Sequence, residues 1–435
     1  KRIIMNKKKL YNIAIVGLGN IGCYLFNFLN KNKNYISNKN NSSFKILYVS
    51  AKNKNKKRNI KLKKSQWVSN FNYILKKKEV DIIVELIGGA EGPAKKLVFG
   101  ALKNKKHVVT ANKALISKYG DKLSMIAEKN KVNLEFEASV CGGVPVIRSI
   151  KEGLIANKIN RIYGILNGTS NYVLSSMEIN KATFSETINK AIKLGYAESN
   201  PSSDINGDDV ASKVKILSSL SFNSFINKNI HVEGIKDIDE EDTTNAKKLG
   251  YNIKLMGFSE ILNNKIFQRV HPTLVKKSSY IASVNGVLNA VIVEGNPIGK
   301  NIIQGEGAGP SATTSALVSD ISSILRGNIK FPFAISNKKR KNFSSGKIED
   351  LFFSSYIRLN VKDKYGVLSD VTKIFSNNKV SIKRVLQNPY KNKKKSSIVI
   401  ITHRSKDSDI QKTLKTLAKK SYIIKKPKLL RIENG

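Results

Sequence analysis

The segment YNIAIVGLGNIG, residues 11–22, decides the fold of the first part of the chain. An apolar, β-branched run ends in glycines spaced G-x-G-x-x-G, and apolar residues then recur at helical spacing. A strand, glycine turn and helix in this order lets the backbone approach a pyrophosphate, whose charge the helix N-terminus stabilises. A turn that serves only packing is the alternative. The predicted backbone contacts to a dinucleotide cofactor are Gly17, Leu18, Gly19, Asn20, Ile21 and Gly22.

Beyond this turn, short apolar runs keep alternating with amphipathic stretches. The expected strands lie at 44–49, 80–86, 107–109 and 132–136, and the expected helices lie at 94–102 and 114–128. Buried strands that alternate with helices are typical of a parallel, doubly wound sheet. The sequence therefore predicts an α/β fold that begins with a Rossmann-type NAD(P)-binding domain over residues 10–136.

Two further domains are predicted. Residues 137–326 combine amphipathic stretches at 183–194 and 208–220 with β-rich pieces at 161–165 and 268–270, which indicates an α+β domain. Residues 327–350, rich in Lys, Asn and Ser, are predicted to form a linker. Residues 351–433 show strand, helix, strand, strand, helix, strand at 356–361, 368–375, 380–386, 397–402, 410–419 and 422–424. This β-α-β-β-α-β order is ferredoxin-like.

Composition limits the class of protein. The chain has 435 residues, of which 40% are hydrophobic, and this length is enough for about three domains. Lys and Arg number 77 against 32 Asp and Glu, a formal net charge of +45. The basic runs at 54–64, 338–341 and 391–395 are interleaved with Asn and Ser rather than aromatic residues, so they indicate solvated loops. We expect no nucleic-acid partner, although a nucleic-acid-binding protein on this scaffold stays open on charge alone.

Cysteine usage and the chain start bear on the compartment. Cys23 and Cys141 are far apart, and neither a disulfide framework nor a structural zinc site is expected. The basic start at 1–9 is not followed by the apolar core of a signal peptide, and the apolar run at 11–18 is too short to span a bilayer. We expect a cytoplasmic protein without a membrane partner.

The ends of the expected strands bear on the cofactor. Residues 48–54, YVSAKNK, contain no acid of the kind that holds the ribose 2′-hydroxyl of NAD. Lys52, helped by Lys54 or Arg58, can pair with a 2′-phosphate, so NADP(H) is favoured over NAD(H). Ordinary surface charge is the alternative for these lysines. Lys113 directly follows a later strand and is predicted to project towards the nicotinamide, with a solvated cap as its alternative.

An acidic loop within residues 191–213 is the most specific signal. It gathers Glu198, Asp204, Asp208 and Asp209, and Lys213 follows Asp209 by one helical turn, which places both on one helix face. Clustered acids beside a lysine can hold a substrate ammonium and can position the lysine as a proton donor. A capped helix N-terminus is the alternative.

These residues resemble the homoserine dehydrogenase family over nearly the whole chain. The run 191–213 matches the family signature A-x3-G-[aromatic/aliphatic]-[small]-x2-[D/N/S]-P-x2-D-[aliphatic]-x-G-x-D-x3-K position for position. The other matching elements are T-A-N-K at 110–113, E-A-S-V-x-G-G-x-P at 137–145, N-G-T-x-N-Y at 167–172 and G-x-G-A-G-x-x-x-T at 305–313. The resemblance implies NAD(P)H-dependent interconversion of L-aspartate 4-semialdehyde and L-homoserine, in the route to threonine, isoleucine and methionine.

The resemblance also implies roles for individual residues. Lys213 is expected to be the general acid that protonates the developing alkoxide, Lys113 to assist it, and Asp209 to orient it. Glu198 is expected to bind the substrate ammonium, within a polar network that Asp204 helps to hold. Gly89 and Gly309 are expected to contact the cofactor. A sodium ion is expected near the domain junction, held mainly by backbone carbonyls at Glu137, Val140, Gly142 and Val144.

The C-terminal domain resembles an ACT domain, a regulatory module that binds amino acids. Its first turn reads DKYGVL, with Tyr365 in place of the usual proline. Threonine feedback is therefore a hypothesis, with simple oligomerisation as the alternative, and a homo-oligomer is expected. A semialdehyde dehydrogenase is the competing enzyme class, but it needs a nucleophilic cysteine, and neither Cys23 nor Cys141 has a histidine partner placed for it.

Overall fold

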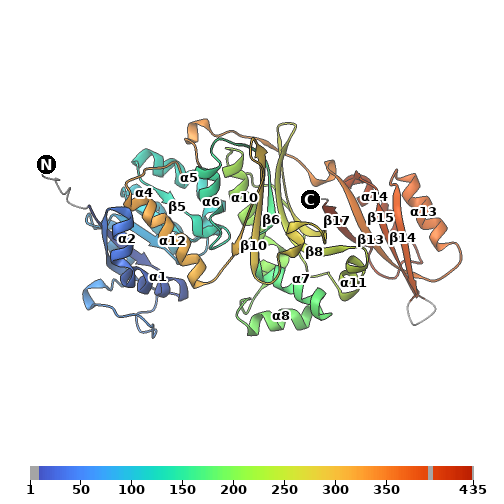
Figure 1. Cartoon of the computed structure of the whole chain (residues 1–435), viewed down its shortest axis with the longest axis horizontal. Coiled ribbons are helices and arrows are strands. Elements are labelled where there is room, and N and C mark those ends of the chain that lie inside the picture. Colours follow the sequence, from blue (N-terminus) through green and yellow to red (C-terminus); the bar gives the residue numbers. More distant parts are fainter. Residues whose placement is uncertain (1–8, 390–394, 434–435) are drawn as a thin grey trace.

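Three parts follow one another along an elongated molecule, as Figure 1 shows. The computed structural model describes residues 9–389 and 395–433. The chain start at 1–8 and all but the last residue of the basic run 391–395 lie outside the described residues. Among the described residues, no helix combines the length and the apolar character that crossing a bilayer requires.

The first part is a five-stranded sheet in the order β2-β1-β3-β4-β5, and all its strands run parallel. Successive side chains of β1 serve opposite faces, because Ile13 and Ile15 pack with α1 while Ala14 and Val16 pack with α4 and α5. This confirms the doubly wound prediction. The strands are Leu10–Val16 (β1), Ser43–Ser50 (β2), Ile82–Glu85 (β3), His107–Thr110 (β4) and Leu134–Glu135 (β5), and the helices are Asn20–Lys31 (α1), Lys33–Asn40 (α2), Phe71–Lys76 (α3), Pro93–Lys103 (α4) and Lys113–Asn130 (α5).

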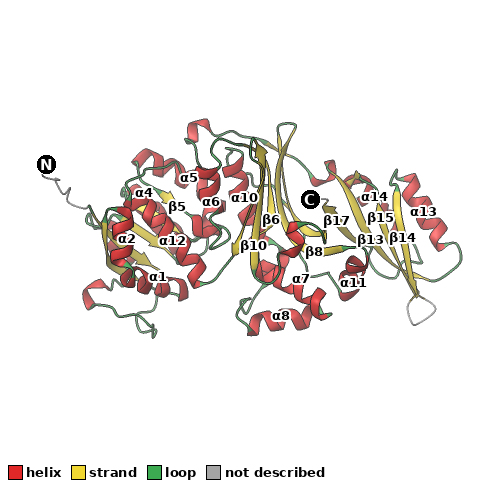
Figure 2. Cartoon of the chain, in the orientation of Figure 1, coloured by secondary structure: helices red, strands yellow, loops and turns green. Residues whose placement is uncertain are grey.

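The second part is α+β, as predicted, and its long strands pair antiparallel in the order β11-β10-β6-β8-β9. Helices α7 and α10 pack against β8, and Figure 2 shows both helices beside the strands of the second part. The strands are Lys158–Ile165 (β6), His231–Val232 (β7), Tyr251–Leu262 (β8), Lys265–Lys276 (β9), Leu288–Asn296 (β10) and Gly299–Glu306 (β11). The helices are Val146–Arg148 (α6), Gly168–Asn180 (α7), Phe184–Lys193 (α8), Ser202–Asn206 (α9), Asp208–Ser221 (α10), Glu240–Lys248 (α11) and Pro310–Leu325 (α12).

The third part has the predicted β-α-β-β-α-β order, but its last strand lies further along the chain than predicted. The elements are Phe352–Lys362 (β13), Val367–Asn377 (α13), Ile382–Pro389 (β14), Lys395–Thr402 (β15), Asp407–Leu417 (α14) and Lys428–Glu433 (β17). The expected strand at 422–424 is wrong, because Ile423 makes only an isolated bridge to Val361. Tyr422 and Ile423 pack against the edge of the small core instead, and Ile424 is exposed. At the first turn, Gly366 has φ of +79° and Tyr365 is fully exposed.

Strand β17 joins the last two parts into one continuous sheet. It pairs antiparallel with β13 and parallel with β9. Because β17 is a central strand, even its charged residue Arg431 is buried. This pairing links the C-terminal domain to the second part by backbone hydrogen bonds.

The segment 327–350, predicted as a linker, packs tightly on its neighbours. Phe333 and Arg340 are buried. Arg340 Nη2 lies 2.6 Å from an Asp121 carboxylate oxygen on α5 and 2.8 Å from Ser219 Oγ on α10. The segment therefore fastens the first part to the second.

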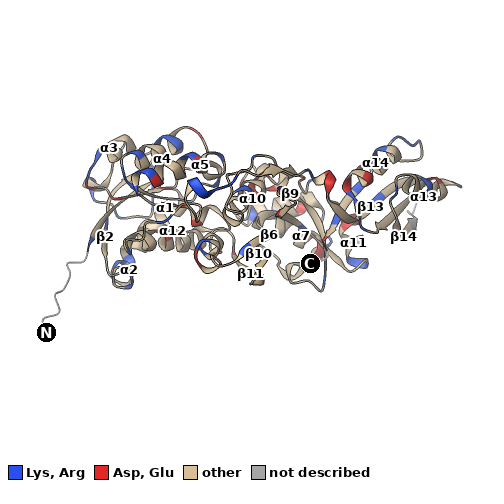
Figure 3. Ribbon diagram, turned by 90° about the horizontal axis from the view of Figure 1, so that it is seen from above, with Lys and Arg blue, Asp and Glu red and all other residues tan. Residues whose placement is uncertain are grey.

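The chain also returns to the first sheet just before this segment. Helix α12 packs against α1, and Leu317, Ile321 and Leu325 share a core with Ile13 and Leu25. The dinucleotide-binding part is thus completed by a helix that the sequence places almost three hundred residues after β1. Figure 3 shows Lys and Arg distributed over all three parts.

Candidate active site

The glycine-rich turn lies at the carboxyl end of β1. Gly17 has φ of +109°, and a Cβ atom there would lie 2.4 Å from the backbone carbonyl of Leu86. A Cβ atom at Gly22 would lie 2.0 Å from the Gly17 oxygen, whereas one at Gly19 would meet no atom within 4 Å. Helix α1 begins after Gly19 without a side-chain cap. Packing thus requires Gly17 and Gly22, and the open side at Gly19 together with uncapped N–H groups suits a pyrophosphate.

A basic side chain lies beside this turn, but it is Arg58 rather than Lys52. Arg58 Nε donates to the carbonyl oxygen of Leu18 over 3.1 Å, and its guanidinium lies over the Trp67 ring at 5.5 Å. Lys52 is exposed, and we find no hydrogen bond or ion pair for it within the described part of the chain. Arg58 is therefore the cation that the fold holds against the turn.

Hydrogen bonds between neighbouring strand ends position Lys113. The buried Glu85 carboxylate accepts from the Thr110 hydroxyl over 2.5 Å. Asn112 donates to the carbonyl oxygen of Gly89 over 2.7 Å and accepts a backbone N–H of the first turn of α5, which it caps. Gly89 has φ of +78° and open space beside its Cα. Lys113 thus begins α5 at the carboxyl edge of the sheet, as predicted.

One buried carboxylate, Asp209, holds two lysines from different parts of the chain. Lys213 Nζ lies 2.8 Å from Asp209 Oδ2, and Lys113 Nζ lies 2.9 Å from Asp209 Oδ1. Lys213 also donates to the carbonyl oxygen of Leu166 over 2.6 Å. Lys213 is 10% exposed and Lys113 is 42% exposed, so the pair spans the distance from the protein interior to the open edge of the first sheet.

The electrostatics of this triad favour its charged form. Burial opposes the ammonium of Lys213, but the Asp209 carboxylate outweighs burial and raises the pKa of Lys213. Burial likewise acts to raise the pKa of Asp209, but Lys213 and Lys113 together hold that pKa well below its usual range. Both lysines therefore share a single negative charge, and the group as a whole is cationic.

Asn167, which the sequence patterns had not marked as a site residue, connects this triad to Asp204. Its side-chain nitrogen donates to Asp204 Oδ1 and to Asp209 Oδ2, each over 2.8 Å, and its oxygen caps α7 by accepting the Ser170 N–H. Burial and the neighbouring Asp209 raise the pKa of Asp204. The signal that could have found this residue is the N-G-T-x-N-Y element that Asn167 begins.

The remaining acids of the loop lie further out. Glu198 and Asp208 are both exposed. Within the described residues we find no ion pair between Glu198 and the triad. The Tyr172 and Tyr196 rings pack edge to face with centroids 5.0 Å apart, beside the loop that carries Glu198. The structure therefore brings Asp204, Asp209, Lys113 and Lys213 together and leaves Glu198 facing solvent.

The turn at 137–145 lies where the first two parts meet. The Glu137 carboxylate accepts two backbone N–H groups at the start of α6, and burial raises its pKa to about 7. The carbonyl oxygens of Glu137 and Val144 accept backbone N–H groups at 3.2 and 2.8 Å. Those of Val140 and Gly142 accept no backbone N–H from the described residues. They are thus available to a cation, although no cluster of acidic, histidine or cysteine ligands occurs within the described ranges.

The second glycine-rich segment, residues 305–309, lies against this turn. A Cβ atom at Gly142 would lie 2.5 Å from the carbonyl oxygen of Gly307. Gly309 has φ of +107° and open space beside it, and α12 begins directly after it without a side-chain cap. The run thus ends in an uncapped helix N-terminus, as α1 does.

The two cysteines do not fit nucleophilic chemistry. Cys141 is buried, and burial raises the pKa of its thiol to about 11. Burial also raises the pKa of Cys23, which lies in α1 with its sulfur 3.5 Å from the Leu18 carbonyl oxygen. A thiol with a raised pKa is a poor nucleophile near neutral pH. The semialdehyde dehydrogenase alternative therefore loses its required group.

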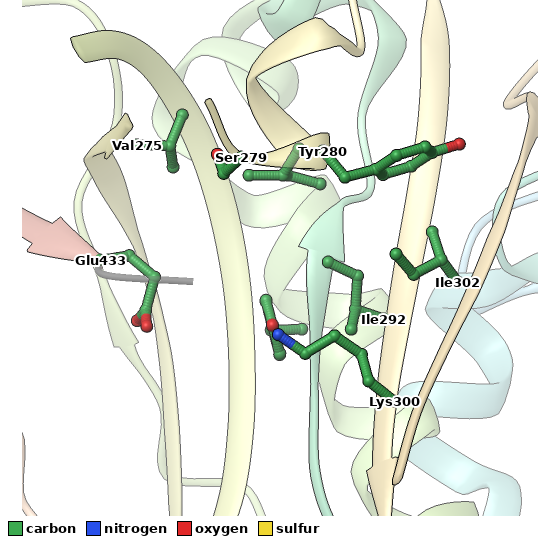
Figure 4. A pocket seen from close by; sticks show the side chains of 9 residues that line it. Val275, Ser279, Tyr280, Ile292, Lys300, Ile302 and Glu433 are labelled. Carbon is green, nitrogen blue, oxygen red and sulfur yellow. The ribbon is translucent and has the colours of Figure 1, made fainter. Parts of the chain in front are cut away.

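A separate hollow lies on the sheet of the second part, away from this chemistry. It measures about 50 Å³ and is lined mainly by apolar side chains such as Val275, Ile292 and Ile302, with Lys300 and Glu433 at its side (Figure 4). None of its lining residues belongs to the triad.

Comparison with known families gives consistent matches along the chain. Residues 17–137 match the family described as homoserine dehydrogenase, NAD binding domain, and residues 145–322 match the family described as homoserine dehydrogenase. Residues 357–425 match the AHAS small subunit-like ACT domain. These three matches follow the order of the three parts of the fold.

Full-length relatives show the same likeness. The homoserine dehydrogenase of Neisseria gonorrhoeae is 35% identical, with 98% of this chain and 99% of that protein covered, and the one of Helicobacter pylori is 36% identical, with 98% and 100% covered. The crystal structure of a homoserine dehydrogenase from Thiobacillus denitrificans is 33% identical, with a TM-score of 0.91 over 98% of this chain and 99% of that one. A hyperthermophilic archaeal homoserine dehydrogenase in complex with NADPH, at 24% identity and a TM-score of 0.63 over 72% of this chain and 97% of that one, shares the fold.

Proposed function

Since the chain belongs to the homoserine dehydrogenase family, and is thus an NAD(P)-dependent oxidoreductase that acts on homoserine, we propose that Lys213 exchanges the proton with the substrate oxygen. When bound, the nicotinamide cofactor supplies or accepts the hydride. In aldehyde reduction the Lys213 ammonium donates its proton to the oxygen, and in homoserine oxidation the neutral amine accepts it.

The observation that carries this proposal is the sharing of Asp209 by two lysines. An isolated Lys–Asp pair is neutral, whereas Lys113, Lys213 and Asp209 together carry one positive charge. A fixed cationic group in a poorly hydrated site stabilises an oxygen on which negative charge develops. Lys113, the more exposed lysine, stabilises that oxygen without giving up a proton.

The substrate ammonium needs a carboxylate that is not already neutralised by a lysine. Asp204 meets this condition, since it accepts from neutral groups, the Asn167 amide and the Thr169 hydroxyl, and forms no ion pair with a lysine among the described residues. Glu198 lies on the preceding loop and faces solvent. We assign ammonium binding to Glu198 and Asp204, with Glu198 turning towards the substrate as it binds.

We assign the cofactor pyrophosphate to the turn at 17–22, and the rest of the cofactor to Lys113, Gly89 and Gly309. A 2′-phosphate would be held by Arg58, helped by the exposed Lys52, so NADP(H) is the preferred cofactor. The absence of acidic residues in β2 and in the loop 51–58 that follows it supports this preference, because an acid would repel the phosphate.

A sodium ion is assigned to the turn at 137–145. The carbonyl oxygens of Val140 and Gly142, with those of Glu137 and Val144, suit this ion, because carbonyl dipoles bind hard cations weakly.

The ACT domain is assigned to threonine feedback on this biosynthetic activity, in a homo-oligomer. Tyr365 is exposed and Gly366 keeps the turn, so the missing proline does not distort this part of the fold.

The test is a homoserine oxidation assay with NADP⁺ and with NAD⁺ on Lys213→Ala. Loss of a general acid–base group should lower kcat by about 10²- to 10⁴-fold, while the Kd for the cofactor should change little. Lys215→Ala is the matched control, because Lys215 lies on the same helix without contact to Asp209 in the described structure. An equal loss in both variants, or a loss of cofactor binding equal to that of turnover, would contradict the assignment.

A further inference from the structure

Arg431 lies in β17, the strand that joins the ACT domain to the second part of the fold, which we call the catalytic domain. Its side chain binds one acid in each of these two domains. Its Nε and Nη2 atoms donate to Asp407 at 2.8 and 3.3 Å, and Asp407 is the first residue of the ACT helix α14. Its Nη1 atom lies 3.0 Å from both carboxylate oxygens of Glu233 in the catalytic domain. The Arg431 and Asp407 side chains are each only 1% exposed. One buried guanidinium therefore ties the start of an ACT helix to the segment 231–235.

The segment 231–235 lies directly against the helix that carries Asp204. The N–H of Ile235 donates to the carbonyl oxygen of Ile205 over 2.9 Å. A Cβ atom at Gly234 would lie 2.3 Å from that same oxygen, so the two backbones touch. The segment 231–235 is also bonded to the sheet, because the Glu233 N–H donates to the carbonyl oxygen of Val270 in β9 over 2.8 Å.

The same segment also supports the turn between α9 and α10. A Cβ atom at Gly207, which has φ of +88°, would lie 3.1 Å from Val232 and 3.2 Å from Val270. Gly207 separates α9, with Asp204, from α10, with Asp209. The position of Asp204 relative to Asp209 therefore depends on where the segment 231–235 lies.

We propose that Arg431 is a positioning residue for homoserine binding: through Glu233 it holds the segment 231–235 against α9, and in this way the ACT domain sets the position of Asp204. The proposal rests on the proposed role of Asp204 in binding the substrate. Arg431 touches no reacting atom. Its removal should weaken substrate binding and leave the proton transfer at Lys213 almost unchanged.

A second arginine of the ACT domain provides the matched control. Arg358 on β13 is also buried, and it binds Asp239, Glu241 and Asp242 of the catalytic domain at 2.6 to 2.8 Å. These acids lie at or in the first turn of α11 rather than on the segment bonded to α9. Arg358 therefore fastens the same two domains by a different route.

The experiment compares Glu233→Gln, Arg431→Lys and the control Arg358→Lys in full-length enzyme, with KM for homoserine, KM for NADP⁺, kcat and Tm as readouts. Glu233→Gln keeps the shape of the side chain, so it carries the test if Arg431→Lys does not fold. In both test variants KM for homoserine should rise about fivefold or more while kcat and KM for NADP⁺ stay within about twofold, the pattern of weakened substrate binding. Arg358→Lys should lower Tm without this rise in KM.

Asp204→Asn separates the two proposals. If Asp204→Asn leaves KM for homoserine unchanged, the proposed role of Asp204 fails. If it raises KM while Glu233→Gln and Arg431→Lys do not, only the positioning role of Arg431 fails. The double variant Asp204→Asn, Glu233→Gln should raise KM by less than the product of the two single effects, because both act on the same contact. A full product would overturn the coupling between them.

Discussion

Replacing Asp209 with Asn tests the reasoning about Lys213 most directly. The change keeps the size of the side chain and removes the only carboxylate that lies within ion-pair distance of Lys213 in the described structure. In the native protein the pKa of Lys213 is raised above that of an ordinary lysine, since the nearby carboxylate outweighs burial. In Asp209→Asn the strongest opposing influence on burial is lost and only the more distant Asp204 carboxylate remains, so the pKa of Lys213 should fall.

The size of the change follows from the geometry. With an Nζ–Oδ2 separation of 2.8 Å, Coulomb's law at an effective dielectric constant of about 20 gives about 6 kcal/mol. The Leu166 carbonyl and the new amide oxygen still accept from the ammonium, so the net loss of stabilisation is smaller than this Coulomb energy, but its sign is the same and the pKa of Lys213 falls.

The assay is the pH dependence of kcat for aldehyde reduction, which needs the ammonium form of Lys213. In the native enzyme this rate should stay constant up to the raised pKa and fall only above it. In Asp209→Asn the fall should begin at a clearly lower pH, because the pKa of Lys213 is lower there. Asp208→Asn, at the exposed neighbouring acid, should leave the profile unchanged. An unshifted alkaline limb in Asp209→Asn would refute the assignment of Lys213 as the proton donor.

Three further predictions follow from the cofactor, ion and effector assignments. Arg58→Ala should raise KM for NADP⁺ by about tenfold or more, as expected for the loss of a charge-assisted phosphate contact, and should change KM for NAD⁺ much less; an equal rise for both would contradict the 2′-phosphate assignment. Activity should fall when sodium is replaced by choline at constant ionic strength and should return when sodium is restored, whereas unchanged activity would remove the cation site. Threonine titrated into the assay should inhibit at millimolar concentration or below, and constant activity over that range would leave the ACT domain without this effector.

The local elements of the candidate site could be predicted from short stretches of sequence. The glycine spacing at 17–22 predicts the turn because only glycine fits the close contacts at Gly17 and Gly22. Asp209 and Lys213 could be paired because residues four apart on a helix lie on one face. The contact at Gly22 and the pairing of Asp209 with Lys213 each lie within one turn or one helix, where covalent geometry fixes the spacing, whereas the contact at Gly17 is with Leu86 at the end of another strand.

The last strand of the C-terminal domain could not be predicted from local sequence patterns. The expected strand at 422–424 failed because apolar β-branched residues pack against a core as readily as they form a strand. The last strand is β17, and it contains Arg431. A charged residue within a short apolar run is not typical of a buried strand, so the sequence pattern did not predict a strand there. Arg431 is tolerated there because Glu233 and Asp407, distant in sequence, neutralise it.

The fold class, the resemblance to a family and the residues suited to catalysis or binding could be predicted from the sequence alone. Glycine spacing, helical periodicity and motif order suffice for this, because they depend on residues that are close together in the chain. Which of these residues lie together depends on the fold. It brought Lys113 from the first sheet to the carboxylate that Lys213 shares, left Glu198 and Lys52 facing solvent, and placed Arg58 and Asn167 in the site. The physical reason is that the distance between residues far apart in the chain is set by packing and strand pairing, which no local pattern encodes.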